Sequence, residues 1–248
     1  MKKIINRKFC VAPMMGYTTP YARNLYRILS KNTFLFSEMI ATKTLIYAKN
    51  TQSVIANEEQ NPIALQVGGS EYGDLKLSSK LAYELNYDEI NLNVGCPSKA
   101  VQKGSFGACL MQNKLLVREC LEEMNKVDIN VSVKCRIGLG KNFNYNFFYE
   151  FIDEIIKSEI NTIYVHARNA ILSGLSPKGN RNIPPLNYEF VKKIKNEFPN
   201  IEFILNGGIN SISKASDLSK EYDGVMLGRL IQTNPFCLSK VDKLFYLE

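Results

Sequence analysis

The chain has 248 residues, of which 45% are apolar and 22% are charged, with 15 Gly and 9 Pro. This composition is typical of a folded domain and excludes a disordered, collagen-like or coiled-coil chain. A length near 250 residues fits one large α/β barrel or two ordinary domains. The formal net charge of +7, from 31 Lys and Arg against 24 Asp and Glu, suits either a polyanionic partner or ordinary solubility.

Cysteine and histidine usage narrows the chemistry. The six cysteines form no C-x-x-C pair, so the spacing favours neither a disulfide framework nor a zinc site. The single histidine, His166, excludes metal sites built on two or three histidines. No signal peptide and no run of 18 apolar residues occurs, so we expect a cytoplasmic protein without metal or membrane span. The sequence does not indicate an oligomeric state, and a monomer is the default expectation.

Eight short apolar, β-rich runs alternate with segments of helical periodicity. They cover residues 9–13, 33–37, 62–67, 88–94, 130–135, 161–166, 201–205 and 223–227. Strict alternation favours a parallel sheet, because parallel neighbours need crossover connections. We therefore predict an α/β fold, a single (β/α)8 TIM barrel over residues 1–248, with an open doubly wound sheet as the alternative. The absence of a G-x-G-x-x-G turn after any strand favours the barrel.

In a barrel, chemistry lies at the C-terminal ends of the strands. The seventh run ends at Asn206 and is followed by Gly207 and Gly208, and the eighth by Gly228 and Arg229. Glycines let backbone N–H groups approach phosphate oxygens, and an arginine adds a fixed charge. We predict a phosphate site here, although the same glycines could serve only as tight turns.

Three polar side chains end other strands and point to a bound ring system. Lys134 and His166 end neighbouring strands, and Gln66 ends the third run. A positive charge with amide and imidazole groups can stabilise electron density that arrives on a flavin. A satisfied core histidine is the alternative for His166.

Cys96 follows the fourth strand between Gly95 and Pro97, whereas Cys10 and Cys135 lie within strands. A free cysteine is usually a small buried hydrophobe, but this position favours a chemical role. Without a second histidine to generate a thiolate, proton donation is the more natural role than nucleophilic attack.

These residues belong to ordered motifs that resemble the tRNA-dihydrouridine synthases, and among them most closely the bacterial A-type. The motifs are Ala12-Pro13-Met14-Met15, Ala64-Leu65-Gln66-Val67-Gly68-Gly69, Asn91-Leu92-Asn93-Val94-Gly95-Cys96-Pro97-Ser98, Lys134-Cys135-Arg136-Ile137-Gly138, His166-Ala167-Arg168 and Asn206-Gly207-Gly208. The A-type likeness is carried by residues 174–178 and 180–186. Together the motifs span essentially the whole chain.

The resemblance implies an FMN-dependent enzyme in which NADPH reduces the flavin. Flavin N5 then gives hydride to C6 of a tRNA uridine while Cys96 protonates C5. The implied flavin set is Pro13, Met14, Met15, Gln66, Lys134, His166, Asn206, Gly207, Gly208, Gly228 and Arg229. Asn93, Lys178 and Arg181 would meet the uridine and its flanking phosphates.

The sequence departs from the family pattern at its C-terminal end. Family members usually continue into a helical domain that helps hold tRNA, and this chain stops about 20 residues after the last predicted strand. The resemblance therefore predicts the catalytic barrel alone, with that domain absent or truncated. Thr19 and Asn169 replace an acidic residue and a lysine common in relatives.

Three other functions share parts of this pattern. A flavin-dependent reductase of a free pyrimidine or small enone would use the same flavin residues without needing Lys178 and Arg181. A non-catalytic tRNA-binding barrel would need neither Cys96 nor a flavin. A phosphosugar enzyme would carry no flavin at all.

Overall fold

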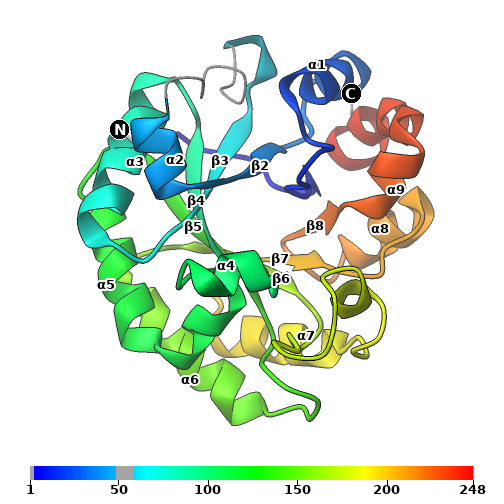
Figure 1. Cartoon of the computed structure of the whole chain (residues 1–248). Helices are drawn as coiled ribbons and strands as arrows, with labels where there is room; N and C mark the ends of the chain where they lie inside the picture. The colour runs from blue at the N-terminus through cyan, green and yellow to red at the C-terminus, as the bar shows by residue number, and fades with distance from the viewer. Residues whose placement is uncertain (1–2, 49–57, 248) are drawn as a thin grey trace.

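The computed structural model describes residues 3–48 and 58–247 and shows a ring of eight parallel strands surrounded by helices (Figure 1). The strands are β1 (Phe9–Val11), β2 (Leu35–Ala41), β3 (Ile63–Gly68), β4 (Glu89–Val94), β5 (Asn130–Arg136), β6 (Thr162–His166), β7 (Glu202–Asn206) and β8 (Gly224–Leu227). Their order in the sheet is β1-β8-β7-β6-β5-β4-β3-β2, and a parallel bridge between Cys10 and Phe34 joins β1 to the chain entering β2. The TIM-barrel prediction is confirmed.

The helices alternate with these strands. They are α1 (Pro20–Leu29), α2 (Thr42–Tyr47), α3 (Tyr72–Glu84), α4 (Lys99–Lys103), α5 (Lys114–Asn125), α6 (Tyr145–Ile155), α7 (Tyr188–Glu197), α8 (Ile212–Leu218) and α9 (Arg229–Thr233). Several begin at an asparagine whose side-chain oxygen accepts a backbone N–H of the first turn, as Asn113 does from Leu116 at 3.2 Å and Asn144 from Phe147 at 3.1 Å. The caps explain why these helices begin where they do.

The second strand lies later in the chain than predicted. Residues 33–37 were expected, but β2 runs from Leu35 to Ala41, and its register with β3 shifts between Phe36 and Met39. The prediction ended before Glu38 because a charged residue interrupts the apolar run. The irregular register lets the strand continue past it, and places Glu38 and Met39 near the C-terminal end of the barrel.

Alternation along the strands divides the core into two parts. Outward residues such as Ile90, Leu92 and Val133 pack in one large apolar cluster with residues of the surrounding helices. The barrel interior has a small apolar cluster of its own, made by Cys10, Ala12, Phe34, Phe36, Ala64, Tyr164, Ile204 and Met226. The inward positions of β4 and β5 carry polar side chains instead, which the sequence shows as alternate residues Glu89, Asn91 and Asn93.

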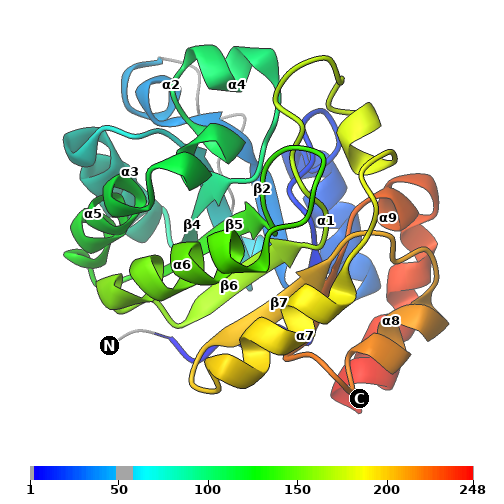
Figure 2. The ribbon, with the colours of Figure 1, turned by 90° about the horizontal axis from the view of Figure 1, so that it is seen from below.

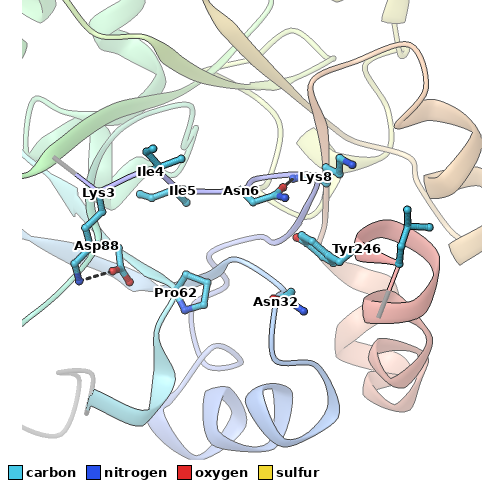
Figure 3. Close-up of a pocket in the computed structure, with 10 residues that line it drawn as sticks. Lys3, Ile4, Ile5, Asn6, Lys8, Asn32, Pro62, Asp88 and Tyr246 are labelled. Atoms are coloured by element: carbon cyan, nitrogen blue, oxygen red, sulfur yellow. Dashed lines mark hydrogen bonds and ion pairs between the residues drawn. The ribbon is translucent and has the colours of Figure 1, made fainter.

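The N-terminal segment crosses the end of the barrel opposite α4, and both chain termini lie toward that end (Figure 2). Arg7 is 7% exposed there and binds Glu89 at 2.5 Å and Glu202 at 3.0 Å. Lys3 pairs with Asp88 beside a cavity of about 320 Å³ between this segment, Pro62 and Tyr246 (Figure 3). None of the predicted site residues lines this cavity.

Among residues 3–48 and 58–247, none of the helices combines the length and the hydrophobicity of a membrane-crossing segment. In the same described part of the chain, no cluster of three or more His, Cys, Asp or Glu side chains is arranged to hold a metal ion.

Candidate active site

The C-terminal strand ends bring the predicted side chains to one mouth of the barrel. Asn93 of β4 is the ladder partner of Lys134 on β5, and His166 of β6 is the partner of Asn206 on β7. The Lys134 ammonium donates to Asn206 Oδ1 at 3.0 Å across the barrel interior. Four strands therefore supply one continuous polar surface.

Cys96 is connected to Gln66 through Asn93. The Asn93 side-chain oxygen accepts the backbone N–H of Cys96 at 2.9 Å and that of Gly95 at 3.1 Å. Its amide nitrogen donates to Gln66 Oε1 at 2.9 Å. Gln66 and Asn93 are 1% and 8% exposed, whereas Cys96 is only partly buried. The predicted proton donor thus lies at the edge of a buried amide network.

Three further contacts hold the main chain around Cys96. Its carbonyl accepts the N–H of Ala108 at 2.9 Å, and Gly95 O accepts from Arg136 Nε at 2.9 Å. Gly107 has φ +79°, and a Cβ there would lie 2.6 Å from the Cys96 carbonyl oxygen. Glycine is therefore required by both its conformation and its surroundings.

Phe106 fills the space behind this loop. Its ring occupies the positions that Cβ atoms on Gly68 and Gly104 would take. Gln102 of α4 donates from its amide nitrogen to Pro97 O at 2.9 Å and to Leu172 O at 3.0 Å, which ties the Cys96 loop to the loop after β6. The loop that carries the thiol is thus packed and hydrogen-bonded on both faces.

Arg136 is a site residue that the sequence interpretation missed. It is 3% exposed, and besides Gly95 O its guanidinium donates to Asn169 O and Asn180 O, both at 3.0 Å. Burial and repulsion from neighbouring arginines lower the pKa of Arg136 to about 10. The alternation Ser132, Lys134, Arg136 marks it as inward-facing, but nothing in the sequence reveals its carbonyl partners.

Lys134 and His166 share a strongly cationic environment. Burial, reinforced by Arg136, lowers the pKa of Lys134 to about 8. Burial and then the charges of Arg136 and Lys134 hold the pKa of His166 well below its usual value. The imidazole is therefore neutral at pH 7 and can both donate and accept a hydrogen bond. Among the described residues, its ring nitrogens have no hydrogen-bond partner within the chain.

The predicted phosphate loops lie beside these groups. Gly207 and Gly208 have φ +113° and +67°, and Cβ atoms there would overlap His166 and Leu186. The positive φ angles fit the tight turns that were the alternative for these glycines, and close packing is a second reason for glycine at both positions. A Cβ on Gly228 would lie 3.3 Å from Met14 Sδ, so the loops after β1 and β8 are neighbours.

The loop that contains Pro13, Met14 and Met15 follows β1. The Thr18 hydroxyl accepts the backbone N–H of Met14 and donates to the Met14 carbonyl oxygen. The backbone N–H of Gly16 donates to Glu38 Oε1 at 2.5 Å. Met15 is 66% exposed. Glu38, which the strand prediction excluded, is thus a missed support of this loop.

The loop after β6 carries the basic residues. Lys178 and Arg181 are exposed on either side of Asn180, which is fully buried and bonded in both directions to the backbone of Ile171. Arg229 donates to Asn182 Oδ1 at 2.5 Å and to Arg181 O at 3.3 Å. Arg229, the first residue of α9, therefore faces this loop, and neither of these hydrogen bonds reaches Gly207 or Gly208.

The charges of the mouth fit an anionic occupant. In the part of the chain that the structure describes, no carboxylate lies within ion-pair distance of Lys134, Arg136, Arg168, Arg181 or Arg229. Arg168 Nε is buried and has no partner. Donors of this kind, with the amides of Gln66 and Asn93, match a phosphate and a ring edge rich in carbonyl groups.

Comparison with known sequences gives extensive matches. A family model described as Dihydrouridine synthase (Dus) matches residues 10–246. A relative from Shewanella oneidensis named tRNA-dihydrouridine(20/20a) synthase is 43% identical over 243 residues, which cover 98% of this chain and 72% of the relative. Relatives of the same name from Escherichia coli K12 and Pseudomonas aeruginosa are 46% and 42% identical, and cover 95% and 98% of this chain and 69% and 73% of their own lengths.

Solved structures of lower identity share the fold. A morphinone reductase variant in complex with tetrahydroNAD aligns with a TM-score of 0.63 at 12% identity, over 93% of this chain and 86% of that one. A mandelate oxidase variant with a monooxide FMN adduct aligns with a TM-score of 0.57 at 12% identity, over 97% and 72%. At this identity the likeness concerns the barrel alone.

Proposed function

Since the chain belongs to the dihydrouridine synthase family, we propose that it reduces the C5=C6 bond of a tRNA uridine to dihydrouridine, with FMN as cofactor and NADPH as reductant. The A-type relatives are named for positions 20 and 20a, and we assign the same D-loop positions as substrate. The observation that carries the proposal is the hydrogen-bonded connection from the Cys96 backbone through Asn93 to Gln66. It lies in a barrel mouth where Lys134 and Arg136 have no carboxylate partner among the described residues.

Bound FMN would supply a hydride to C6 of the uracil ring. Gln66, Lys134 and His166 would bind the edge of the flavin ring, because they offer donors and a positive charge where negative charge develops on reduction. Pro13, Met14 and Met15 would cover the ring. Asn206, Gly207, Gly208, Gly228 and Arg229 would hold the ribityl chain and phosphate.

Cys96 would hold the proton that C5 needs. Hydride addition at C6 builds enolate character at C4–C5, which an adjacent acid must quench. The hydrogen-bonded main chain holds the backbone of Cys96 in one place, with its N–H bound to Asn93. The remaining amide hydrogen of Asn93 can bind a uracil carbonyl oxygen.

A uridine inside folded tRNA reaches this mouth only when it leaves its stack. Lys178 and Arg181, exposed at the rim, would bind the flanking phosphates. A free pyrimidine would need no such rim, which separates this proposal from a small-molecule reductase.

Purified protein tests the proposal directly. We expect a yellow protein with one non-covalent FMN that converts uridine to dihydrouridine in unmodified tRNA and leaves free uridine unchanged. Lys134→Ala should weaken FMN retention. A protein that takes up no added FMN, or that reduces free uridine in preference to tRNA, would contradict it.

A further inference from the structure

A buried ladder of polar side chains runs along the barrel interior below the proposed flavin site. The sheet register places Gln66, Asn91 and Ser132 in one row across β3, β4 and β5. Gln66 Nε2 donates to Asn91 Oδ1 at 2.8 Å, and Asn91 Nδ2 donates to Ser132 Oγ at 2.7 Å. Ser132 donates in turn to Glu89 Oε1. Asn91, Ser132 and Glu89 are fully buried.

At the deep end of the ladder, the donors and acceptors can be arranged in only one order. Glu89 meets the Arg7 guanidinium, which only donates, at 2.5 and 2.9 Å. As a carboxylate, Glu89 can only accept, so the Ser132 hydroxyl must donate to it. Ser132 then accepts the amide hydrogen of Asn91, which turns the Asn91 oxygen toward β3 and requires Gln66 to donate.

The mouth end requires the same direction independently. The backbone N–H groups of Gly95 and Cys96 can only donate, so the oxygen of Asn93 must face them. The amide nitrogen of Asn93 then faces Gln66 Oε1, as observed at 2.9 Å. Both fixed ends agree, and the amide nitrogen of Gln66 is left with one hydrogen for a ligand.

We propose that Asn91 and Ser132 are positioning residues, oriented by Glu89, that set the direction of the Gln66 amide and so the donor it offers to the flavin. This inference rests on the proposed function, because it takes the flavin as the occupant of the mouth. A reversed Gln66 would present a carbonyl oxygen to the oxygen-rich edge of the ring, where it would repel the charge that reduction places there.

Replacing Asn91 tests the ladder at its centre. Asn91→Leu removes the acceptor of Gln66 and keeps the same branched arrangement of four side-chain heavy atoms, and we expect about tenfold weaker FMN binding, since one oriented hydrogen bond is lost. The absorption maximum and midpoint potential of the bound flavin should shift with it. Ser132→Ala should change affinity, spectrum and potential in the same direction but by less, because it deletes only one hydroxyl. If Asn91→Leu does not fold, Ser132→Ala tests the inference on its own.

Thr162→Val is the matched control. Thr162 is 1% exposed and its hydroxyl donates to Glu202 at 3.0 Å near the base of the barrel, outside the ladder. It should lower stability without changing the spectrum or potential. Unchanged affinity, spectrum and potential in Asn91→Leu and Ser132→Ala, or equal changes in Thr162→Val, would overturn the inference.

A readout in the flavin-free protein separates this inference from the proposed function. With selective ¹⁵N-glutamine labelling, the side-chain amide hydrogen of Gln66 that bonds to Asn91 should exchange slowly in the wild type and rapidly in Asn91→Leu. Its signal is assigned by its loss in Gln66→Met. Slow exchange in a wild type that binds no FMN would reject the proposed function alone, and fast exchange in the wild type would reject the ladder.

Discussion

Arg7 at the N-terminal end of the barrel and Arg136 at the C-terminal end are both buried, yet they meet different partners. Arg7 binds the carboxylates of Glu89 and Glu202, whereas Arg136 binds three backbone carbonyls. Burial opposes the charge of each. At the base, burial is the largest single effect, but the attractions of Glu89, Tyr164 and Glu202 together outweigh it and raise the pKa of Arg7. At the mouth, burial prevails and lowers the pKa of Arg136 to about 10.

The difference shows that charged residues at the base of the barrel stabilise the fold, whereas those at the mouth serve the chemistry. A charge neutralised by carboxylates contributes little field to a ligand, so the base serves to hold strands together. A charge that meets only carbonyl dipoles keeps its field, and the mouth retains several such charges around Lys134 and His166. We therefore expect changes at the mouth to alter function directly. Changes at the base should alter stability first, and should reach the flavin site only through the ladder from Glu89 to Gln66.

The largest effect should come from the thiol at the mouth. Cys96→Ala should leave FMN binding and NADPH oxidation nearly unchanged and lower uridine reduction by about 10²- to 10⁴-fold, as removal of a general acid does. Single-turnover reduction and oxidation of the flavin measure the two halves separately. Cys109→Ala, in the same loop, should affect neither, and equal loss of both halves in Cys96→Ala would mark Cys96 as structural.

At the base, Arg7→Met should lower the free energy of unfolding by about 3–5 kcal/mol, because the buried carboxylate of Glu89 and the partly exposed carboxylate of Glu202 lose their partner. Denaturant unfolding measures it. Lys192→Ala is the control, since its ion pair with Glu221 is about half exposed and should contribute no more than about 1 kcal/mol. Similar losses in the two variants would remove the distinction between a stabilising base and a reactive mouth.

Lys134 gives the mouth a pH dependence. With a pKa of about 8 in the free protein, its charge is present below that pH and lost above it, whereas an ordinary lysine stays charged to about 10.5. FMN affinity should therefore fall by up to about tenfold from pH 7 to pH 9, because the anionic FMN loses the attraction of the Lys134 ammonium. Titrations of flavin fluorescence across this range measure it. Lys134→Arg should bind with no such dependence, and a sloping curve in that variant would assign the titration to another group.

The smallest effect concerns the rim. Arg181→Ala should reduce the slope of log affinity for tRNA against log salt by about 0.7–0.9, the change expected for one lost phosphate contact. FMN affinity should not change. Lys192→Ala, an exposed lysine on α7 that pairs with Glu221, provides the comparison. Equal slopes for wild type and Arg181→Ala would place the phosphate contacts elsewhere on the chain.

Sequence patterns predicted the strand positions well, because parallel barrel strands are apolar runs separated by helices. The end of β2 was missed because Glu38 looks like a terminator and the register shift that carries the strand past it leaves no sequence signal. Gln66 and Cys96 were predicted as site residues from their places at strand ends, and Asn93 from the family resemblance. Their mutual hydrogen bonds were not, since these depend on how neighbouring strands are staggered.

The polar residues that face the barrel interior also show that a sequence does not reveal the contacts between neighbouring strands. Alternation indicates that Asn91 and Ser132 face the interior, and an ordinary reading would count them as isolated polar residues. Only the register of β4 against β3 and β5 shows that they join Gln66 to Glu89. Arg136 was missed for the related reason that backbone carbonyls, its partners, carry no sequence identity.

Phe106 imposes a constraint on how this loop can diverge. Because its ring fills the space beside both Gly68 and Gly104, a side chain at either position requires the ring to move or residue 106 to become smaller. The order of substitutions therefore matters: Gly104→Ala should cost less after Phe106→Ala than before it. The three positions, on two separate strand–helix units, form one epistatic group and are expected to change together.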